Sequence, residues 1–344
     1  MNTLLTREEF KKAVFERDSF KCVMCGEPAV DAHHIIDRSL WEESGGYYLD
    51  NGVSLCAGHH LDAERTVISC KILRQKAGIT NILMPDHFFI EEEYDHWGNI
   101  VKPSGVRYKG GSFFKENVQK ALKEGGVLAD FSPYVKYART FHLPTSPNLE
   151  NDDRMHKHLD FLTGKMVVGS IKMDGENTSL YPDYYHARSL DSAHHESQSY
   201  VKAIHGSIAH EIPNGWRICG ENLYAKHSIH YHNLGSYFNV FSIWNEVNVA
   251  LSWKDTMEYA VMLGLQSVPC FYIGIWNPDV IHEAFLEYCD KSVDDVEGYV
   301  VRIAGEIPYG EFYRSTAKWV RKNHVRTSKF WRSETVIPNE LANG

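Results

Sequence analysis

The chain has 344 residues and a mass of 39.4 kDa, a length that predicts two or three domains and excludes a single small module. Hydrophobic residues form 43% and charged residues 24% of it, which excludes a disordered or fibrous protein. The formal net charge of −9 excludes a globally basic protein, so nucleic-acid binding must come from a local patch. Since no apolar run has the length of a membrane helix or a signal peptide, we expect a cytoplasmic protein without membrane partners.

Two helices are predicted near the N-terminus. The first begins after Thr6, because Thr6 and Glu9 have capping-box spacing and Phe10 starts an apolar face. The second is predicted over residues 69–78, where Gly78 ends it. The sequence between these helices is rich in Cys and His.

The rest of the chain predicts a connector followed by an α+β domain. Residues 85–160 carry repeated Gly and Pro, which predicts an irregular segment with some packed aromatic side chains. Strands are predicted at 165–173, 215–224, 237–244, 267–276 and 297–303, and helices at 197–211, 253–263 and 279–289. The predicted organisation is a small unit at 1–84, a connector and lead-in at 85–160, and a larger domain at 161–344.

The cysteines predict a metal site. Seven is an odd number, and most of the cysteines lie far from one another, which argues against a disulfide framework. Cys22-x-x-Cys25 and Cys56-x-x-His59 are two ligand pairs that bracket a compact segment, a pattern typical of tetrahedral zinc. We therefore predict that these four side chains bind Zn²⁺.

More imidazoles lie beside the zinc ligands than one zinc ion needs. His33-His34 lies between the two ligand pairs, Asn51 precedes the second pair, and His60 follows it directly. This order of residues resembles the HNH (ββα-metal) nuclease family over about residues 15–65.

The resemblance implies a role for each of these residues. His34 would be the general base that deprotonates a water, while His33 and His60 would hold a divalent cation against the scissile phosphate. Asn51 would orient the base or its loop. His59 stands where many members of the family have a fourth cysteine. The alternative is a zinc-stapled module that binds nucleic acid or the partner domain without cutting.

A second constellation begins at Lys172-Met-Asp174-Gly175, directly after an apolar run. The lysine would project from a strand end into a pocket, and Gly175 would permit a close backbone approach. Five further elements follow in order: Arg188, Gly220-Glu221-Asn222, Phe241, Glu297-Gly298 and Lys318. The ordered set resembles the covalent nucleotidyltransferase superfamily over about residues 165–325, and within it the ATP-dependent RNA ligases.

The resemblance implies an ATP-grasp-like two-sheet fold and a lysyl-AMP intermediate on Lys172. Glu221 would bind ribose hydroxyls, Phe241 would stack on the base, and Glu297 would bind Mg²⁺ or Mn²⁺. Arg188 would pair with phosphate oxygens. The nucleotide-binding set would be Lys172, Asp174, Gly175, Arg188, Glu221, Phe241, Glu297 and Lys318.

Lys318 would stabilise the charge that develops on the α-phosphate. Because the attacking amine must be neutral, the pKa of Lys172 must be lowered by burial or by neighbouring positive charge, which Lys318 and a metal ion could supply. Phe238 could take the stacking role of Phe241 if the strand register slips. Ile171 stands where many RNA ligases have a glutamate that contacts adenine, which leaves base selectivity open.

The C-terminal stretch predicts a nucleic-acid contact. Only 26 residues follow Lys318, too few for the C-terminal OB-fold domain of DNA ligases and capping enzymes, so RNA ligase is the preferred relative. Residues 314–332 contain seven Lys or Arg, no acidic residue, and interleaved aromatic rings. Arg314, Arg321 and Lys322 are the predicted contacts. The alternative is a helix that packs its aromatic side chains on the domain.

These observations predict an ATP-dependent RNA ligase that joins 5′-phosphate and 3′-hydroxyl ends, with an HNH-like unit that processes ends or recognises nucleic acid. Its substrate would be nicked or broken RNA, such as a tRNA or an RNA–DNA hybrid. One alternative is a metal-dependent HNH nuclease regulated by a nucleotide-binding ligase-like domain. Another is a nucleic-acid-binding adaptor without activity. The sequence makes no prediction of oligomeric state.

Overall fold

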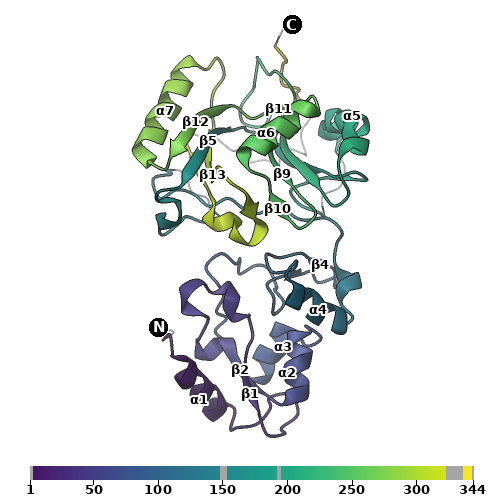
Figure 1. Ribbon diagram of the computed structural model, residues 1–344, viewed down its shortest axis with the longest axis vertical. Coiled ribbons are helices and arrows are strands. Elements are labelled where there is room, and N and C mark those ends of the chain that lie inside the picture. The colour runs from purple at the N-terminus through teal and green to yellow at the C-terminus, as the bar shows by residue number, and fades with distance from the viewer. Residues whose placement is uncertain (1–2, 148–152, 192–194, 323–335, 343–344) are drawn as a thin grey trace. The chain divides into compact units, whose positions relative to one another are not determined.

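The computed structural model describes residues 3–147, 153–191, 195–322 and 336–342. The chain divides into two compact units, Met1–Val135 and Lys136–Gly344 (Figure 1). The interval expected as a connector is thus shared between them: residues 85–135 belong to the first unit and residues 136–160 to the second. Within the described residues, no helix combines the length and the apolar character that crossing a membrane requires.

The first unit begins with the predicted capped helix. The Thr6 hydroxyl accepts a hydrogen bond from the Glu9 amide at 3.3 Å, and the Glu9 carboxylate accepts one from the Thr6 amide at 2.8 Å. Its elements are α1 (Arg7–Arg17), β1 (Asp31–His34), β2 (Gly52–Leu55), α2 (Ala57–Glu64), α3 (Cys70–Lys76), β3 (Ile100–Val101), β4 (Arg107–Tyr108) and α4 (Glu116–Glu124). Strands β1 and β2 pair antiparallel and lead into α2, which is a ββα arrangement.

Helix α4 corrects the expectation that residues 85–160 are irregular. Val118 and Leu122 are fully buried on one face of α4, where four-residue spacing brings them together. The helix ends at the Gly125-Gly126 pair. The segment also belongs to the fold of the first unit, because Trp97 Nε1 donates to the Glu64 carbonyl at 2.7 Å.

The second unit contains every strand and helix predicted after residue 161, together with short elements that were not predicted. Its elements are β5 (Met166–Lys172), β6 (Glu176–Leu180), β7 (Tyr185–Ala187), α5 (Ser199–Ile208), β8 (Arg217–Asn222), β9 (Phe238–Trp244), β10 (Val249–Ala250), α6 (Trp253–Met262), β11 (Gln266–Ser267), β12 (Cys270–Ile275), α7 (Pro278–Lys291), β13 (Gly298–Ile303), β14 (Ile307–Pro308) and β15 (Thr316–Val320). Short 3-10 helices lie in both units. Those of the first unit are Arg38–Leu40, Glu42–Ser44, Leu49–Asn51 and Leu128–Asp130, and those of the second are Asp160–Leu162, Glu196–Gln198, Ala209–Glu211 and Tyr309–Arg314.

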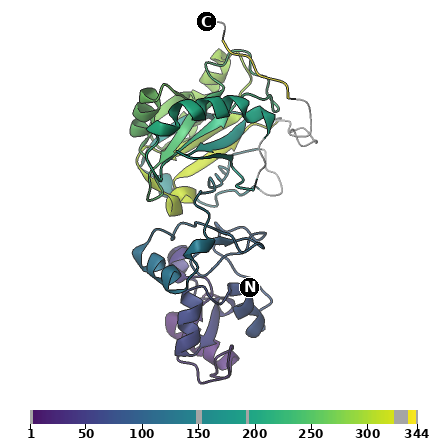
Figure 2. The same cartoon turned by 90° about the vertical axis from the view of Figure 1, so that its right-hand side faces the viewer.

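Two sheets form the framework of this unit. A four-stranded antiparallel sheet has the order β12-β5-β13-β15 and is covered by α7, whose Ile281 and Phe285 enter its core. A seven-stranded sheet has the order β14-β10-β9-β8-β6-β7, with β11 paired to β9. Helices α5 and α6 pack on this larger sheet through Val201, Ile208 and Ala260 (Figure 2). The fold is therefore α+β with two sheets, as expected.

Strand β15 decides the structure of the first part of the basic stretch. Residues 316–320 pair antiparallel with β13, so the helix considered as an alternative does not form there. The Trp319 ring stacks on Tyr299 with centroids 5.6 Å apart and an interplanar angle of 12°. Trp319 is thus a packing residue of the smaller sheet.

Candidate active site and metal clusters

Strand register places Lys172 beside Glu297. Lys172 is the last residue of β5 and pairs with Gly298, the first residue of β13, so the preceding Glu297 lies next to the lysine. Lys172 Nζ is 2.5 Å from Glu297 Oε2, and the Glu297 side chain is buried. Glycine is required at 298, because a Cβ there would lie 2.0 Å from the Trp319 carbonyl oxygen.

Strand β8 contributes the next carboxylate, Glu221. Glu221 pairs with Asn177 of β6, directly after the turn that contains Gly175. A Cβ at position 175 would lie 2.5 Å from the Asn222 carbonyl oxygen and 3.0 Å from Glu221 Cγ. The glycine of the Lys-x-Asp-Gly motif therefore brings the end of β5 close to β8, which is the close backbone approach expected from the sequence.

The carboxylates dominate the electrostatics of this site. Burial raises the pKa of Glu221 to about 8, and the charges of Glu297, Asp174 and Glu176 add to burial while Lys172 opposes it. Burial lowers the pKa of Lys172, but Glu297, Glu221 and Asp174 together raise it above its ordinary value. Burial alone thus does not lower the pKa of this amine below its ordinary value. The amine contacts the Glu297 carboxylate, whereas the ammonium of Lys318 contacts Asp153.

Asp174 holds the loop between β8 and β9. Its Oδ2 accepts hydrogen bonds from the Ser228 amide at 2.8 Å, the Ser228 hydroxyl at 2.6 Å and the Ile229 amide at 2.7 Å. The Asp174 amide donates to the Tyr231 hydroxyl at 2.9 Å. This motif residue thus connects the loop 223–234 to the end of β5.

Lys318 lies in a cluster that sequence analysis missed. Its Nζ is 2.9 Å from Asp153 Oδ1, and His142 Nε2 is 3.1 Å from Asp153 Oδ2. His142 Nδ1 also lies 2.8 Å from the Ser146 hydroxyl. Burial raises the pKa of Asp153, but His142 and Lys318 lower it by more, so Asp153 is ionised. The sequence signal for this cluster is the Asp152-Asp153-Arg154 run of the lead-in.

Tyr137, also in the lead-in, joins two of the predicted nucleotide residues. Arg188 Nε donates to the Tyr137 carbonyl at 3.4 Å, and the Phe241 ring meets the Tyr137 ring edge-on at 5.3 Å between centroids. Phe241 is partly exposed, whereas Phe238 is fully buried in the core of the larger sheet. Of the two alternatives, Phe241 is thus the ring that keeps an accessible surface.

The structure describes the three predicted nucleic-acid contacts but not the later part of the basic stretch. The Arg314 guanidinium lies over the Tyr313 ring at 5.6 Å, and Arg321 pairs with Asp295 at 3.2 Å. Lys322 is exposed. The remaining cations and rings of the stretch lie outside the described residues, namely Arg326, Lys329, Phe330, Trp331 and Arg332.

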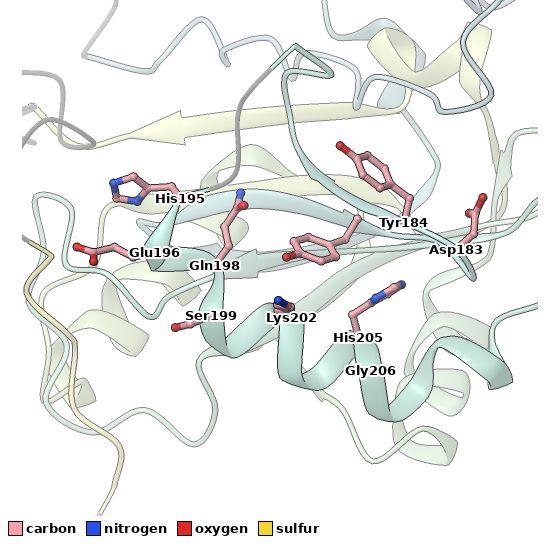
Figure 3. A pocket seen from close by; sticks show the side chains of 10 residues that line it. Asp183, Tyr184, His195, Glu196, Gln198, Ser199, Lys202, His205 and Gly206 are labelled. Atoms are coloured by element: carbon pink, nitrogen blue, oxygen red, sulfur yellow. The ribbon is translucent and has the colours of Figure 1, made fainter.

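The second unit also has an open cavity of about 720 Å³ beside β7 and α5, which sequence analysis did not predict. Figure 3 shows Lys202 and His205 on α5, with Tyr184 on the segment that enters β7. The Tyr184 and Tyr185 rings stack with an interplanar angle of 23°. Rings and a cation in one cavity are the groups that bind unpaired bases and phosphates.

In the first unit, the four predicted zinc ligands come together. Their ligand atoms all lie within 4.8 Å of one another. Cys56 Sγ is 3.2 Å and Cys22 Sγ is 3.5 Å from His59 Nδ1, and Cys25 Sγ is 3.8 Å from Cys56 Sγ. Donors around a tetrahedral zinc ion are about 3.4 to 3.8 Å apart. Two of these separations lie in that range and the Cys56–His59 separation lies just below it, so the donor set is compatible with Zn²⁺.

His33 and His60 lie side by side next to this cluster. Their ring centroids are 5.0 Å apart, and His60 Nε2 is 3.5 Å from Asp31 Oδ2. His33 Nε2 is buried without a hydrogen-bond partner among the residues that the structure describes. An imidazole nitrogen of this kind is available to a metal ion.

His34 faces different neighbours from His33. Its ring stacks on Phe10 at 4.5 Å and meets Tyr47 edge-on at 5.1 Å. Burial lowers the pKa of His34 to about 4, so the ring is neutral at pH 7. Asn51 contacts the loop that follows β1. Its side chain accepts a hydrogen bond from the Ile36 amide at 3.0 Å and donates one to the Ile36 carbonyl at 3.1 Å.

One family model matches part of the second unit. Residues 165–320 match the family model described as RNA ligase. This segment of the second unit is similar to RNA ligases, and it includes Lys172, Glu221, Glu297 and Lys318. No curated protein matches the chain.

Several solved structures are similar to parts of the chain. A mutant RNA ligase from Naegleria gruberi, solved with ATP and Mn, has 14% identity over 47% of this chain and 51% of its own, with a TM-score of 0.32. An archaeal ATP-dependent RNA ligase has 12% identity over 76% of this chain and 63% of its own, with a TM-score of 0.38. This chain therefore spans about half the length of the Naegleria enzyme. Because these TM-scores are too low to establish a shared fold, the class of the domain depends on the family-model match.

Proposed function

We propose that the protein is an ATP-dependent RNA ligase that joins 5′-phosphate and 3′-hydroxyl ends through a lysyl-AMP intermediate on Lys172. The observation that carries this proposal is the 2.5 Å contact between Lys172 Nζ and the buried carboxylate of Glu297, inside the segment that matches the RNA ligase model. A half-buried amine at a strand end, surrounded by carboxylates, is suited to act as a nucleophile once its proton has left.

In the first step, Lys172 Nζ attacks the α-phosphorus of ATP, a P–N bond forms, and pyrophosphate leaves. Glu297 Oε2 is the nearest acceptor for the ammonium proton. AMP then passes from Lys172 to the 5′-phosphate of the RNA, which releases the amine. The 3′-hydroxyl finally attacks that 5′-phosphate, a phosphodiester forms, and AMP leaves.

The acidic residues around Lys172 fit a divalent cation. Mg²⁺ and Mn²⁺ prefer carboxylate oxygens, which Glu221 and Glu297 supply. Burial raises the pKa of Glu221 to about 8, and the charge of Glu297 adds to this effect. These two residues would hold the ion, as expected for Glu297 from the sequence. A bound cation would neutralise phosphate charge and lower the pKa of Lys172.

The other predicted residues take roles that suit their positions. We assign Lys318 to the α-phosphate, Arg188 to the outer phosphates, and Phe241 to the base. Glu221 can bind ribose hydroxyls in addition to the cation. Asp174 and Gly175 shape the pocket from the end of β5, through the loop contacts and the close approach described above.

The proposed RNA contacts are the tyrosine-lined cavity and the basic stretch. Tyr184 and Lys202 offer a ring and a cation in one cavity. Arg314 adds positive charge just before β15, and Arg321 and Lys322 add it just after this strand. Nicked RNA, broken tRNA and an RNA–DNA hybrid are the candidate substrates, and a panel of 5′-phosphorylated substrates separates them.

Labelling with α-³²P-ATP and Mg²⁺ tests the proposal. The label should stay on the denatured protein and be absent from Lys172→Ala, whereas Lys165→Ala, an exposed lysine before the same strand, should label normally. Sealing of nicked RNA should likewise be lost in Lys172→Ala and retained in Lys165→Ala. Absence of label on the wild-type protein would contradict the ligase and leave the nucleotide-regulated nuclease or the adaptor.

For the first unit, we propose a zinc ion on Cys22, Cys25, Cys56 and His59. A second candidate function, phosphodiester cleavage at an HNH-type site, is favoured by the buried Nε2 of His33 beside His60. Cleavage should be measured in the Lys172→Ala background, so that sealing cannot mask it. Divalent-dependent cutting that is lost in His34→Ala and retained in His210→Ala supports cleavage. Absence of cutting would leave nucleic-acid recognition as the role of this unit.

A further inference from the structure

Three side chains of the second unit form a cluster that the ligase reaction does not use. His230 and His232 lie in the loop between β8 and β9, and Glu340 lies in the C-terminal segment. One ligand atom of each lies within 4.8 Å of the others. His232 Nδ1 is 3.4 Å from Glu340 Oε2, His230 Nε2 is 3.9 Å from Glu340 Oε1, and the two imidazole rings are 4.3 Å apart.

The His232–Glu340 separation is that of two donors around one metal ion, and the His230–Glu340 separation is about half an ångström longer. Two donors bound to a tetrahedral ion at about 2.1 Å lie about 3.4 Å apart, which is the His232–Glu340 distance. His230 Nε2 is inaccessible to solvent and has no hydrogen-bond partner among the described residues. A buried nitrogen without a partner is costly, and a metal ion would satisfy it.

The cluster joins two segments that are already tied through their backbones. We call residues 336–342 the strap. The strap pairs with the loop 223–234 through bridges between Ala225 and Pro338 and between Leu234 and Leu341. The Glu340 amide donates to the Tyr231 carbonyl at 2.9 Å, so the backbone of Glu340 is held while its side chain reaches the histidines.

Asn339 anchors the strap from inside. It is buried, its Oδ1 accepts from the Tyr231 amide at 2.9 Å, and its Nδ2 donates to the Leu223 carbonyl at 2.8 Å. The same loop donates to Asp174 through Ser228 and Ile229. The loop therefore connects the strap to Asp174, which lies two residues after Lys172 in the sequence.

We propose that His230, His232 and Glu340 form a structural binding site for a divalent transition metal ion, with zinc as the expected ion. Two imidazoles and one carboxylate are ligands of Zn²⁺, Co²⁺ and Ni²⁺, whereas Mg²⁺ and Ca²⁺ prefer oxygen donors alone. The ion would bind the side chains of loop and strap together and stabilise both against local opening.

Zinc content of the full chain tests the proposal. Wild-type protein saturated with Zn²⁺ and freed of excess ion should hold about one equivalent more than His232→Ala and Glu340→Gln, measured by mass spectrometry of the metal. Zinc bound in the first unit adds the same amount to the zinc content of each of these proteins. His210→Ala and Glu211→Gln are matched controls, since this exposed pair is 3.9 Å apart elsewhere in the same unit, and they should retain the wild-type content.

Hydrogen exchange provides a second readout that does not depend on ligase activity. Zn²⁺ should slow exchange of amides in 336–342 and 223–234 by about tenfold in the wild type and leave Glu340→Gln unchanged. Glu340→Gln keeps the fold, because its side chain is 60% exposed and its backbone forms the strap pairing. Equal zinc content in wild type and Glu340→Gln, or zinc-independent exchange of the strap, would overturn the proposal.

Discussion

Lys318 Nζ lies 2.9 Å from Asp153 Oδ1, although 165 residues separate the two side chains in the sequence. Backbone pairing causes this proximity: the Lys318 amide donates to the Phe141 carbonyl at 2.8 Å, and the Leu143 amide donates to the Lys318 carbonyl at 2.7 Å. The lead-in segment thus runs beside β15. The cation assigned to the α-phosphate is thus held by a carboxylate that His142 also contacts.

The first prediction concerns Asp153→Asn. We expect the rate of lysyl-AMP formation to fall about tenfold, with a smaller change in the KM for ATP, because Lys318 loses the partner that positions it. Single-turnover labelling with α-³²P-ATP measures both quantities. Asp160→Asn, an exposed aspartate of the same segment, should behave as wild type. An unchanged rate in Asp153→Asn would show that the ion pair has no part in positioning Lys318.

The second prediction concerns pH. Glu297 is one of the carboxylates that raise the pKa of Lys172, so Glu297→Gln should lower that pKa. The pH at which the deprotonated amine becomes available therefore moves to lower values. The maximum rate should still fall about 100-fold, because the nearest proton acceptor and a cation ligand are lost. A pH–rate profile of adenylation checks both effects, and a shift to higher pH would contradict the assignment.

The third prediction concerns Gly175→Ala. The added methyl would lie 2.5 Å from the Asn222 carbonyl oxygen, which is backbone and cannot rotate away. We expect the free energy of unfolding to fall by about 1–3 kcal/mol and adenylation to decrease as Glu221 is displaced. Gly206→Ala is the control, since nothing lies within 4 Å of its Cβ position in α5, and it should be neutral or stabilising. Thermal unfolding monitored by circular dichroism compares the two variants.

The fourth prediction concerns the Cys3His cluster. Cys25→Ala should lose about one zinc per chain and unfold the first unit at lower temperature, because bound zinc contributes directly to folding. Cys270→Ala removes an exposed cysteine of the second unit and should change neither quantity. Metal analysis and differential scanning calorimetry measure the two effects. A Cys25→Ala protein with unchanged zinc content would exclude this site.

Local sequence predicted the regular elements well where one signal dominated. The capping box at Thr6 and Glu9 formed as expected, and Asn277 with Pro278 begins α7. Strand β6 was missed because its buried positions include Thr178 and Ser179, which hide the apolar pattern of a core strand. Helix α4 was missed because flanking glycines outweighed its short apolar face.

The sequence by itself determined the ligand types and the order of the site residues, since Cys-x-x-Cys spacing and motif order are properties of the chain. Only the tertiary structure decided which charges meet. Strand pairing between β5 and β13 brought Glu297 into contact with Lys172. The position of the lead-in beside β15 brought Asp153 into contact with Lys318. Electrostatic energy depends on distance and burial, and both are set by contacts between residues that are remote in sequence. For that reason the direction of the Lys172 pKa shift could be found only in the folded protein.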